Sequence, residues 1–411
     1  MRVLIVSTSE TVGGAAIAAS RLTDALNQNG VEARMLVRDR QTDRPTTIQV
    51  KAPCWIPRFM QKAWRLLPKA RERLSIFMLT GSKSWDIDTA TDGFSITSTK
   101  AFRKADVIHL HWVNQGMVSL EEIGRILNAG KPVVWTLHDL WPVMALHHYG
   151  DVEREMALTE ERTAAGILAR WVWGRKQKAY SQGRITFVGC SRWIAAEARR
   201  STLTEGHEVV SIPNPFPASI FLDKPDISRS ALGLPEDKNL VLFCAQKTTD
   251  ERKGIKYLLE ACQKLKDEDV ALAVVGASMP ALDELPLPVY HLGYISSPKT
   301  MATIYTLASV FVTPSLEDNL PNTIMEAMAC GTPCVGFRVG GIPEMIDHKQ
   351  NGYVAAYKDS TDLAEGIRWT LRNREECSRA AQQKAVSEWG EGNVARRFIS
   401  MYQTAIRQSK S

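Results

Sequence analysis

Short apolar runs alternate with segments of helical periodicity along most of this 411-residue chain. The apolar runs are expected to be strands: Val3–Ser7, Ala33–Val37, Val107–His111, Val133–Thr136, Thr186–Gly189, Val209–Ile212, Leu240–Cys244, Ala271–Val275, Val289–Leu292, Val310–Thr313 and Pro333–Phe337. Helical patterns such as Ala15–Gln28, Ile255–Lys264 and Asn322–Ala329 lie between them. This alternation is typical of parallel sheets covered by helices. Eleven strands are too many for one modest sheet, so the pattern predicts two doubly wound α/β domains.

A proline-rich segment marks the predicted boundary between the two domains. It reads Pro213-Asn214-Pro215-Phe216-Pro217, and three prolines in five residues end both strands and helices. A final helical pattern, Val394–Ile406, follows Trp389. We therefore expect a first domain at residues 1–213, a second at 214–388 and a C-terminal helix within 389–411.

Composition is ordinary for a globular protein, with 44% hydrophobic and 23% charged residues. No run of about 18 apolar residues occurs, so no membrane span is expected. The opening MRVLIVSTS has too short an apolar core for a signal peptide and predicts a buried first strand. Seven scattered cysteines, an odd number mostly within apolar runs, favour reduced thiols in a cytoplasmic protein over a disulfide framework or a zinc site.

Positive charge is concentrated in one segment. The net charge is +6, and residues 51–79 hold seven basic residues against one acid, Glu72. Aromatic and aliphatic residues such as Trp55, Phe59 and Trp64 interleave with them. Such a stretch suits the anionic surface of a membrane, which would make the protein peripheral at the inner face of the plasma membrane. The alternative is a partly buried helix with a solvated basic face. Nucleic acid is not expected as a partner, because no recognised binding module accompanies the charge.

The densest chemistry lies in residues 310–344, FVTPSLEDNLPNTIMEAMACGTPCVGFRVGGIPE from Phe311 on. The pattern predicts a strand, a polar loop, a helix and a second strand. Backbone N–H groups and the positive end of a helix at such a loop suit an anion. Asp318 in the loop and Glu326 on the helix can bind hydroxyls. Phosphate at one end and hydroxyls at the other describe a nucleotide sugar.

The same segment resembles the donor-binding signature of glycosyltransferase family 4, P-S-x-x-E-G-F-G-L-x-x-x-E-A-M-A-x-G-x-P-V-V. Eight residues fall in register with it: Pro314, Ser315, Glu326, Ala327, Met328, Ala329, Gly331 and Pro333. Asp318 stands in place of the first glutamate, and Asn319-Leu320-Pro321 replaces Gly-Phe-Gly. The resemblance implies the GT-B fold, in which two Rossmann-like domains face each other across a ligand-binding cleft and the last helix crosses back to the first domain.

The resemblance also implies roles for individual residues. The first acid of the signature contacts the sugar or lies near its anomeric centre, which assigns that role to Asp318. The second acid, Glu326, is expected to bind the ribose hydroxyls. Phosphate or sugar is expected to meet backbone groups of four neighbours of these acids: Asn319, Leu320, Asn322 and Thr323.

A basic loop, KTTDERKG, follows the strand Leu240–Cys244. Relatives carry G-R-x-x-x-x-K-G here, and both cations neutralise the diphosphate leaving group. Lys253 with Gly254 matches directly, whereas the arginine has no direct counterpart. Arg252 or Lys247 is expected to supply the second charge. Tyr294, in His291-Leu-Gly-Tyr294, resembles the segment that holds the base, and the sequence does not distinguish uracil, guanine or adenine.

Further candidates follow strands of the first domain. Gly13 and Gly14 let backbone N–H groups approach a ligand at a helix start, and the resemblance places this loop beside donor and acceptor. A plain tight turn is the alternative. His111 ends a strand near the cleft, while His109, on the same face, is expected to be a satisfied core histidine.

Thr136-Leu-His138-Asp139 ends another strand and resembles the T-x-H-D of family 4, including the V-V-W-T-L-H-D-x-W of several bacterial exopolysaccharide enzymes. His138 is expected to donate to the sugar or to the leaving phosphate. Asp139 is expected to orient His138 or to cap the next helix. Asp86-Ile-Asp88 is formally a D-x-D metal motif, but no apolar strand precedes it. We read it as a loop and expect no catalytic metal and no cofactor.

The resemblance to family 4 implies a retaining, hexosyl-type glycosyltransferase. The donor is expected to be a nucleoside-diphosphate sugar, and the acceptor a hydroxyl of a lipid-linked or polysaccharide glycan in bacterial exopolysaccharide or lipopolysaccharide synthesis. The candidate catalytic residues are His138, Asp318 and Lys253. Two alternatives stay open: a non-catalytic partner protein with a GT-B fold, and an epimerase acting on a nucleotide sugar.

Overall fold

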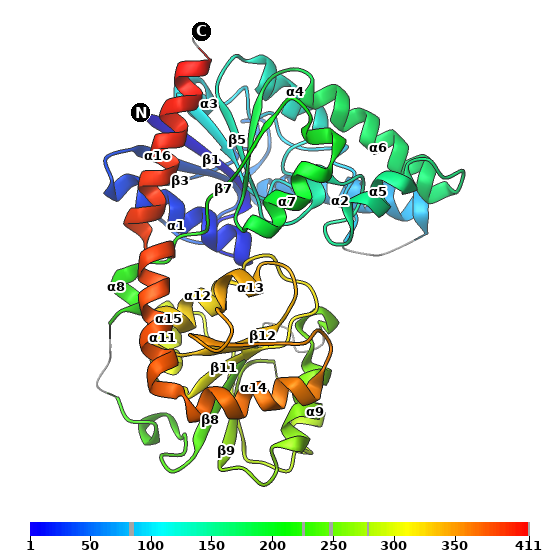
Figure 1. Ribbon diagram of the computed structural model, residues 1–411. Coiled ribbons are helices and arrows are strands. Elements are labelled where there is room, and N and C mark those ends of the chain that lie inside the picture. Colours follow the sequence, from blue (N-terminus) through cyan, green and yellow to red (C-terminus); the bar gives the residue numbers. More distant parts are fainter. Residues whose placement is uncertain (82–85, 224–226, 246–249, 278, 410–411) are drawn as a thin grey trace. The chain divides into compact units, whose positions relative to one another are not determined.

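The chain forms two compact units, Met1–Pro215 with Val394–Ser411 and Phe216–Asn393. The computed structural model describes residues 1–81, 86–223, 227–245, 250–277 and 279–409. Each unit contains one parallel sheet covered by helices (Figure 1), so the prediction of two Rossmann-like domains is confirmed. The predicted boundaries lay after residues 213 and 388.

Unit 1 is built on a seven-stranded sheet with the order β3-β2-β1-β4-β5-β6-β7. Every strand pair in it is parallel. The strands are β1 (Arg2–Ser9), β2 (Glu32–Asp39), β3 (Thr47–Gln49), β4 (Val107–Leu110), β5 (Val133–Leu137), β6 (Ile185–Gly189) and β7 (Glu208–Ser211). The helices are α1 (Gly14–Gln28), α2 (Gln61–Thr80), α3 (Lys100–Lys104), α4 (Leu120–Asn128), α5 (Val152–Leu158), α6 (Ala164–Tyr180), α7 (Arg192–Arg200) and α16 (Glu391–Gln408), with 3₁₀ turns η1 (Arg58–Met60), η2 (Trp141–Val143) and η3 (Thr202–Thr204).

Alternate residues of β1 enter two separate cores, because successive side chains of a strand point to opposite faces. Val3 and Ile5 pack with α1 and with Phe398 and Tyr402 of α16. Leu4 and the other strand residues on its face pack with α4 and α6. The sheet is thus buried on both sides, as the continuous apolar runs of its strands require.

Unit 2 has a six-stranded parallel sheet with the order β10-β9-β8-β11-β12-β13. Its strands are β8 (Asn239–Ala245), β9 (Val270–Gly276), β10 (Val289–Gly293), β11 (Val310–Thr313), β12 (Cys334–Phe337) and β13 (Gly352–Ala355). Its helices are α8 (Ala218–Phe221), α9 (Ile255–Lys264), α10 (Pro280–Asp283), α11 (Pro298–Leu307), α12 (Asn322–Ala329), α13 (Ile342–Met345), α14 (Ser360–Arg372) and α15 (Arg374–Trp389), with 3₁₀ turns η4 (Ser230–Leu232) and η5 (Glu251–Lys253).

Each sheet has one point at which the strand order reverses. It lies between β1 and β4 in unit 1 and between β8 and β11 in unit 2. Loops that leave the carboxyl ends of such a pair diverge to opposite faces, and ligands of open α/β sheets bind in the crevice between them. The topology therefore brings together the loops after β8 and β11, which are far apart in sequence.

All eleven predicted strands are present, and α9 and α12 have the predicted bounds. Two strands were missed, β3 and β13. Both lie at the edges of their sheets, where strands are short and partly polar. None of the helices in the described ranges has the length and hydropathy needed to span a bilayer.

Candidate functional site

Lys253 and Asp318 meet at the strand-order reversal of unit 2. The Lys253 ammonium lies 2.8 Å from Oδ2 of Asp318, with the two side chains 38% and 16% exposed. Lys253 ends η5, after β8, and Asp318 lies in the loop after β11. An ammonium has three N–H donors, so one bond to Asp318 leaves Lys253 able to contact an anion as well.

Two glycines allow the loops to come this close. Gly254 has φ +66°, and a Cβ there would lie 1.8 Å from the carbonyl oxygen of Pro314. Gly340 has φ +55°, and its Cβ would lie 1.8 Å from the carbonyl oxygen of Asp318. The Leu316 N–H also donates to the Arg252 carbonyl at 2.7 Å. The Lys253–Asp318 contact therefore rests on backbone packing that only glycine permits.

Arg252 lies next to this pair and is engaged by its own loop. Its Nε and Nη2 donate to the two carboxylate oxygens of Asp250 at 3.0 and 2.8 Å. The Arg252 side chain is still 45% exposed. Lys247, the other candidate for the second cation, lies outside the described residues.

The amino end of α12 begins directly after the Asp318 loop. Its N-cap residue, Pro321, makes no side-chain capping bond, and no acidic residue occupies its first turn, so no carboxylate within the helix's first turn opposes an anion at the positive end of the dipole. Asn322 and Thr323 form that first turn, while Asn319 and Leu320 are buried in the loop before it. An anion placed here would face backbone N–H groups.

Glu326 lies one turn further along α12 and is 8% exposed. Its Oε2 accepts a hydrogen bond of 3.2 Å from the hydroxyl of Tyr305 on α11. Burial, together with the nearby charge of Glu326, raises the pKa of both the Tyr305 hydroxyl and the Cys244 thiol at the end of β8. Tyr305 is a partner of the site that the sequence reasoning missed.

Tyr294, another predicted donor residue, does not lie on the loops that carry Lys253 and Asp318. It follows β10, an edge strand separated from β8 by β9, and its side chain is 68% exposed. In the described part of the chain no hydrogen bond or ion pair links it to Lys253 or Asp318.

In unit 1, a row of neutral histidines follows β4 and β5. His111 Nδ1 lies 2.8 Å from His138 Nε2. Burial lowers the pKa of His138 to about 4 and that of His111 well below its ordinary value. His109 bonds Tyr402 at 2.6 Å and Thr136 at 2.8 Å through its two ring nitrogens. It is the satisfied core histidine that the sequence predicted.

Asp139 is held by hydrogen bonds from three other residues. Its Oδ2 accepts from the Trp112 indole and from His148, each at 2.8 Å, and its Oδ1 accepts from the Trp141 backbone at 3.1 Å. Burial alone would raise the pKa of Asp139, but these donors, His148 foremost, lower it. The bond to the Trp141 N–H, at the first residue of η2, is compatible with the expected capping role, and the orienting role stays a prediction.

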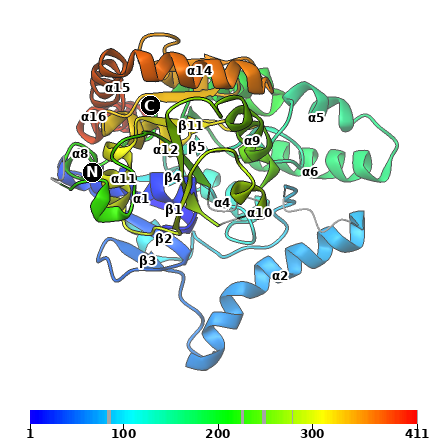
Figure 2. The same cartoon turned by 90° about the horizontal axis from the view of Figure 1, so that it is seen from below.

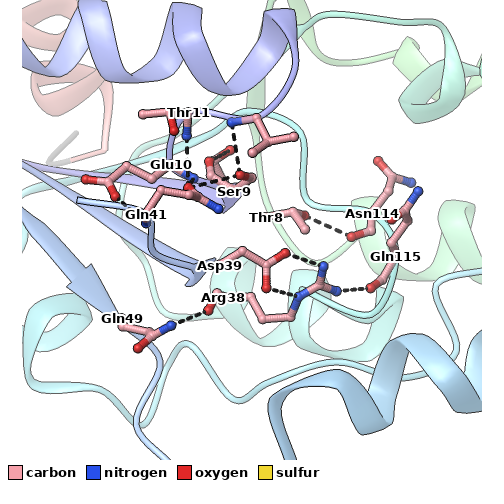
Figure 3. A network of polar contacts seen from close by, with 12 residues as sticks. Thr8, Ser9, Glu10, Thr11, Arg38, Asp39, Gln41, Gln49, Asn114 and Gln115 are labelled. Carbon is pink, nitrogen blue, oxygen red and sulfur yellow. Dashed lines mark hydrogen bonds and ion pairs between the residues drawn. The ribbon is translucent and has the colours of Figure 1, made fainter. Parts of the chain in front are cut away.

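The loop that carries Gly13 and Gly14 is held by a polar network at the carboxyl ends of β1 and β2 (Figure 3). The Gln41 amide oxygen accepts from the backbone N–H groups of Glu10 and Thr11 at 3.1 and 3.2 Å. Gly13 has φ +92° and precedes α1 without contact to a would-be Cβ. The Val12 N–H also donates to the Ser9 hydroxyl at 3.2 Å, so the network fixes the loop up to Val12, and the space around a Cβ at Gly13 is open.

Glu10 anchors this network from a fully buried position. Its carboxylate accepts from the backbone N–H groups of Gln41 and Thr42, both at 2.8 Å, and from the hydroxyls of Thr42 and Thr47 at 2.7 and 2.6 Å. Burial alone would raise the pKa of Glu10, but these bonds lower it. Nothing in the sequence indicated a role for Glu10 except its position at a strand end.

Asp88 of the D-x-D motif is a structural residue of unit 1. It is buried, and its two carboxylate oxygens accept from the backbone N–H groups of Ala90 and Gln115 at 3.0 and 2.7 Å. Both oxygens of the Asp88 carboxylate therefore bind backbone groups of loops. This agrees with the prediction that the Asp86–Asp88 segment is a loop.

Two family models match the chain. The model for Glycosyltransferase Family 4 matches residues 12–219, and the model for glycosyl transferases group 1 matches residues 238–373. The chain belongs to Glycosyltransferase Family 4. The prediction of this family is confirmed.

Several curated relatives resemble part of the chain. An uncharacterized glycosyltransferase of Methanocaldococcus jannaschii is 30% identical over 190 residues, which is 43% of this chain and 48% of that protein. Spore coat protein SA of Bacillus subtilis is 30% identical over 195 residues, 43% of this chain and 51% of that protein. A D-inositol 3-phosphate glycosyltransferase of Mycobacterium avium is 24% identical over 338 residues, 74% of this chain and 70% of that protein. The chain thus spans about half the length of the first two.

Solved structures share the fold over nearly the whole chain. Sucrose-phosphate synthase of Thermosynechococcus elongatus gives a TM-score of 0.66 at 18% identity, covering 99% of this family 4 chain and 100% of that chain. Anabaena Alr3699/HepE in complex with UDP-glucose gives 0.62 at 15% identity, covering 98% and 100%. At these identities the likeness concerns the fold, and the predicted GT-B class is confirmed.

Proposed function

We propose that this family 4 chain is a retaining glycosyltransferase that moves a sugar from a nucleoside-diphosphate sugar to a hydroxyl group of an acceptor. The observation that carries the proposal is the Lys253–Asp318 pair at the strand-order reversal of unit 2, beside the uncapped amino end of α12. A cation, a helix amino end and a carboxylate within one crevice match a diphosphate joined to a sugar.

The proposed reaction breaks the bond between the anomeric carbon and the diphosphate oxygen and forms a bond from that carbon to the acceptor oxygen. The acceptor proton passes to the leaving phosphate. Lys253, Arg252 and the amino end of α12 stabilise the charge that develops on the diphosphate, in place of a metal ion. Asp318 contacts the sugar, and Glu326 binds the ribose hydroxyls. The protein then contributes mainly positioning and electrostatics.

The acceptor side of the proposal rests on Gly13, His111, His138 and Asp139 of unit 1. With its pKa lowered to about 4, His138 is neutral at pH 7. It can therefore donate or accept a hydrogen bond but supplies no charge, which leaves charge neutralisation to Lys253 and Arg252. As partners we propose the nucleotide sugar, a lipid-linked or polysaccharide acceptor of bacterial surface glycan synthesis, and an anionic membrane at the cytoplasmic face.

The proposal is tested by calorimetric titration with UDP, GDP and ADP and their sugars, followed by assays for slow donor hydrolysis. We expect one nucleoside diphosphate to bind, its sugar form to be hydrolysed slowly, and Lys253→Ala to abolish both. Binding without release of any free sugar would favour the non-catalytic partner protein. Conversion of the nucleotide sugar into its epimer would favour the epimerase. No binding of any of these nucleotides would refute the donor site.

A further inference from the structure

Unit 1 contains a cavity of about 760 Å³ that reaches the amino ends of β1 and β2. Its lining begins with Arg2, Val3 and Leu4 of β1 and Glu32 of β2, the residues at the amino ends of these strands. The histidine row and the Gly13 loop lie at the carboxyl ends. The cavity therefore serves neither donor nor acceptor chemistry as proposed above, and its volume is in the range of ligand sites.

The walls of the cavity are apolar and its charged lining is basic. Leu4, Leu36, Ile48, Phe94 and Trp64 contribute to the walls. The charged lining residues in the described ranges are Arg2, Arg34, Lys51, Lys100, Lys104 and a single acid, Glu32. Arg2 and Arg34 pair with Asp106 and Glu32. An apolar interior with an excess of cations matches an amphiphile that carries an anionic head.

Trp64 connects the cavity to α2, whose inner face is firmly held. The rings of Trp64 and Phe94 lie 5.1 Å apart. The backbone at Pro68 and Lys69 approaches Gly116 so closely that a Cβ there would lie 2.5 Å from the Lys69 nitrogen. Further along, Ile76 is 1% exposed in the core. These contacts fix the orientation of α2 on unit 1. They therefore determine which of its side chains point outward.

Glu72 completes the inner face of α2. Its Oε1 accepts from the backbone and the hydroxyl of Thr89 at 2.8 and 2.7 Å, and Glu72 is fully buried. It is the one acid between residues 51 and 79. Because Glu72 points inward, the charged side chains on the described outer surface of residues 51–79 are all basic.

The outer face of α2 is apolar, the reverse of an ordinary surface helix. At about 100° per residue, its large exposed side chains fall within an arc of about 120° centred opposite Glu72: Leu66, Leu67, Leu74, Phe77 and Met78. Lys62 and Arg71 flank this arc on its two sides. Figure 2 shows α2 at the margin of unit 1, clear of the neighbouring helices along most of its length.

The segment before α2 extends the same surface. Trp55 and Phe59 are 75% and 85% exposed. Of the fifteen large apolar side chains exposed in the described ranges, eight lie between Trp55 and Met78. Exposed apolar side chains gathered in this way mark a docking surface, and basic flanks beside them suit an anionic bilayer, into which an apolar helix face sinks.

We propose that unit 1 carries a binding site for an anionic phospholipid: the cavity takes the lipid chain, the lysines at its rim meet the headgroup, and the outer face of α2 lies in the bilayer surface. This lipid site gives the membrane named under the proposed function a defined contact on the chain. It does not depend on glycosyl transfer, because it is measured without donor or acceptor.

The docking face is tested by co-sedimentation of the full chain with vesicles of phosphatidylglycerol and phosphatidylcholine, compared with pure phosphatidylcholine. We expect binding to the anionic vesicles, lost at high salt, and about tenfold weaker for Leu74→Glu or Phe77→Glu. Val386→Glu, which changes an apolar residue of unit 2 that is 42% exposed, close to the 46% of Phe77, is the matched control. Equal binding by all variants would overturn the proposal. So would a self-association in solution that Leu74→Glu abolishes, because the face would then be an interface between copies of the chain.

The cavity is tested separately with soluble single-chain lipids below their micelle concentration. We expect lauroyl-lysophosphatidylglycerol to quench or shift tryptophan fluorescence more strongly than lauroyl-lysophosphatidylcholine. Ser98→Trp fills the cavity from an exposed lining position and should abolish this difference, whereas Leu74→Glu should preserve it. Unchanged lysolipid binding by Ser98→Trp would show that the chain does not enter the cavity and would overturn the assignment.

Discussion

Gly254→Ala tests the backbone packing that brings Lys253 to Asp318. Gly254 has φ +66°, and the added Cβ would lie 1.8 Å from the Pro314 carbonyl oxygen, where real contacts stay above 3.0 Å. The two loops would have to separate by about 1.2 Å, the difference 3.0 − 1.8. That movement would break the Leu316–Arg252 backbone bond of 2.7 Å and loosen the Lys253–Asp318 contact.

Gly233→Ala is the matched control. Gly233 also follows a 3₁₀ turn of unit 2 and has φ +68°, but nothing lies within 4 Å of its would-be Cβ. Both variants share the strain of a left-handed alanine, about 1–2 kcal/mol. Gly254→Ala adds the overpacking term of about 1–3 kcal/mol and one lost hydrogen bond of about 1 kcal/mol. We therefore expect it to lower the free energy of unfolding by about 2–4 kcal/mol more than the control does.

Three measurements check this expectation. Urea unfolding compares the two free energies, hydrogen exchange follows the Leu316 amide, and calorimetry follows nucleoside-diphosphate binding. In Gly254→Ala the Leu316 amide should exchange faster and the affinity should fall, while Gly233→Ala should leave both unchanged. If the two variants unfold with the same free energy and the Leu316 amide stays protected, the close approach of the loops is not as described.

Other residues give further predictions. Glu326→Ala should weaken nucleotide binding by tenfold or more, about 1.4 kcal/mol, because the carboxylate held by Tyr305 is assigned to the ribose; unchanged affinity by calorimetry would exclude that role. Asp318→Asn should leave the affinity for the free nucleoside diphosphate within a few-fold and slow donor hydrolysis, and equal hydrolysis rates would speak against a contact with the sugar. Burial foremost, with Asp88 adding to it, raises the pKa of Glu72 from 4.5 to about 8, so the folded state holds a proton that the unfolded state releases. Stability should then fall as pH rises from about 4.5 to 8, by up to about 1.4 kcal/mol per pH unit, and urea unfolding of Glu72→Gln should show a flatter profile; an unchanged slope would contradict the raised pKa. Glu10→Ala leaves four donors without an acceptor and should lower the unfolding free energy of unit 1 by about 3 kcal/mol or more, whereas exposed Glu153→Ala should change it little.

The sequence predicted the architecture well because buried parallel strands are continuous apolar runs that contrast with their surroundings. The edge strands β3 and β13 lack that contrast and were missed. The burial of Glu72 could not be predicted from the sequence either, because a charged residue in a basic helix is expected to be solvated. Only the three-dimensional packing against Thr89 shows that this acid is removed from the surface.

For the candidate site, the sequence indicated which residues to expect near a ligand, but it did not indicate which side chains contact one another. Lys253 and Asp318 were both expected near a ligand, but their contact follows from the strand order, which no local pattern contains. Arg252, which with Lys247 was a candidate for the second cation at the diphosphate, is bound by Asp250 two residues away, a partner that the sequence reasoning did not name. Asp139 and His138 are adjacent in sequence, yet the structure gives them different partners, Trp112 and His111. Long-range contacts such as Gln41 to Thr11 carry no signal in a single sequence.

The discontinuity of unit 1 has a consequence for how the chain is synthesised. Phe398 and Tyr402 of α16 cover the same core as Val3 and Ile5 of β1, and Tyr402 also bonds His109. Domains generally fold as they leave the ribosome, amino-terminal one first. Here that order is reversed: unit 2 is continuous from Phe216 to Asn393 and is complete while the first unit still lacks its last helix. The part of the first sheet's face that α16 covers therefore stays exposed until α16 has been synthesised, and a chaperone that shields this nascent apolar surface would be expected to bind there.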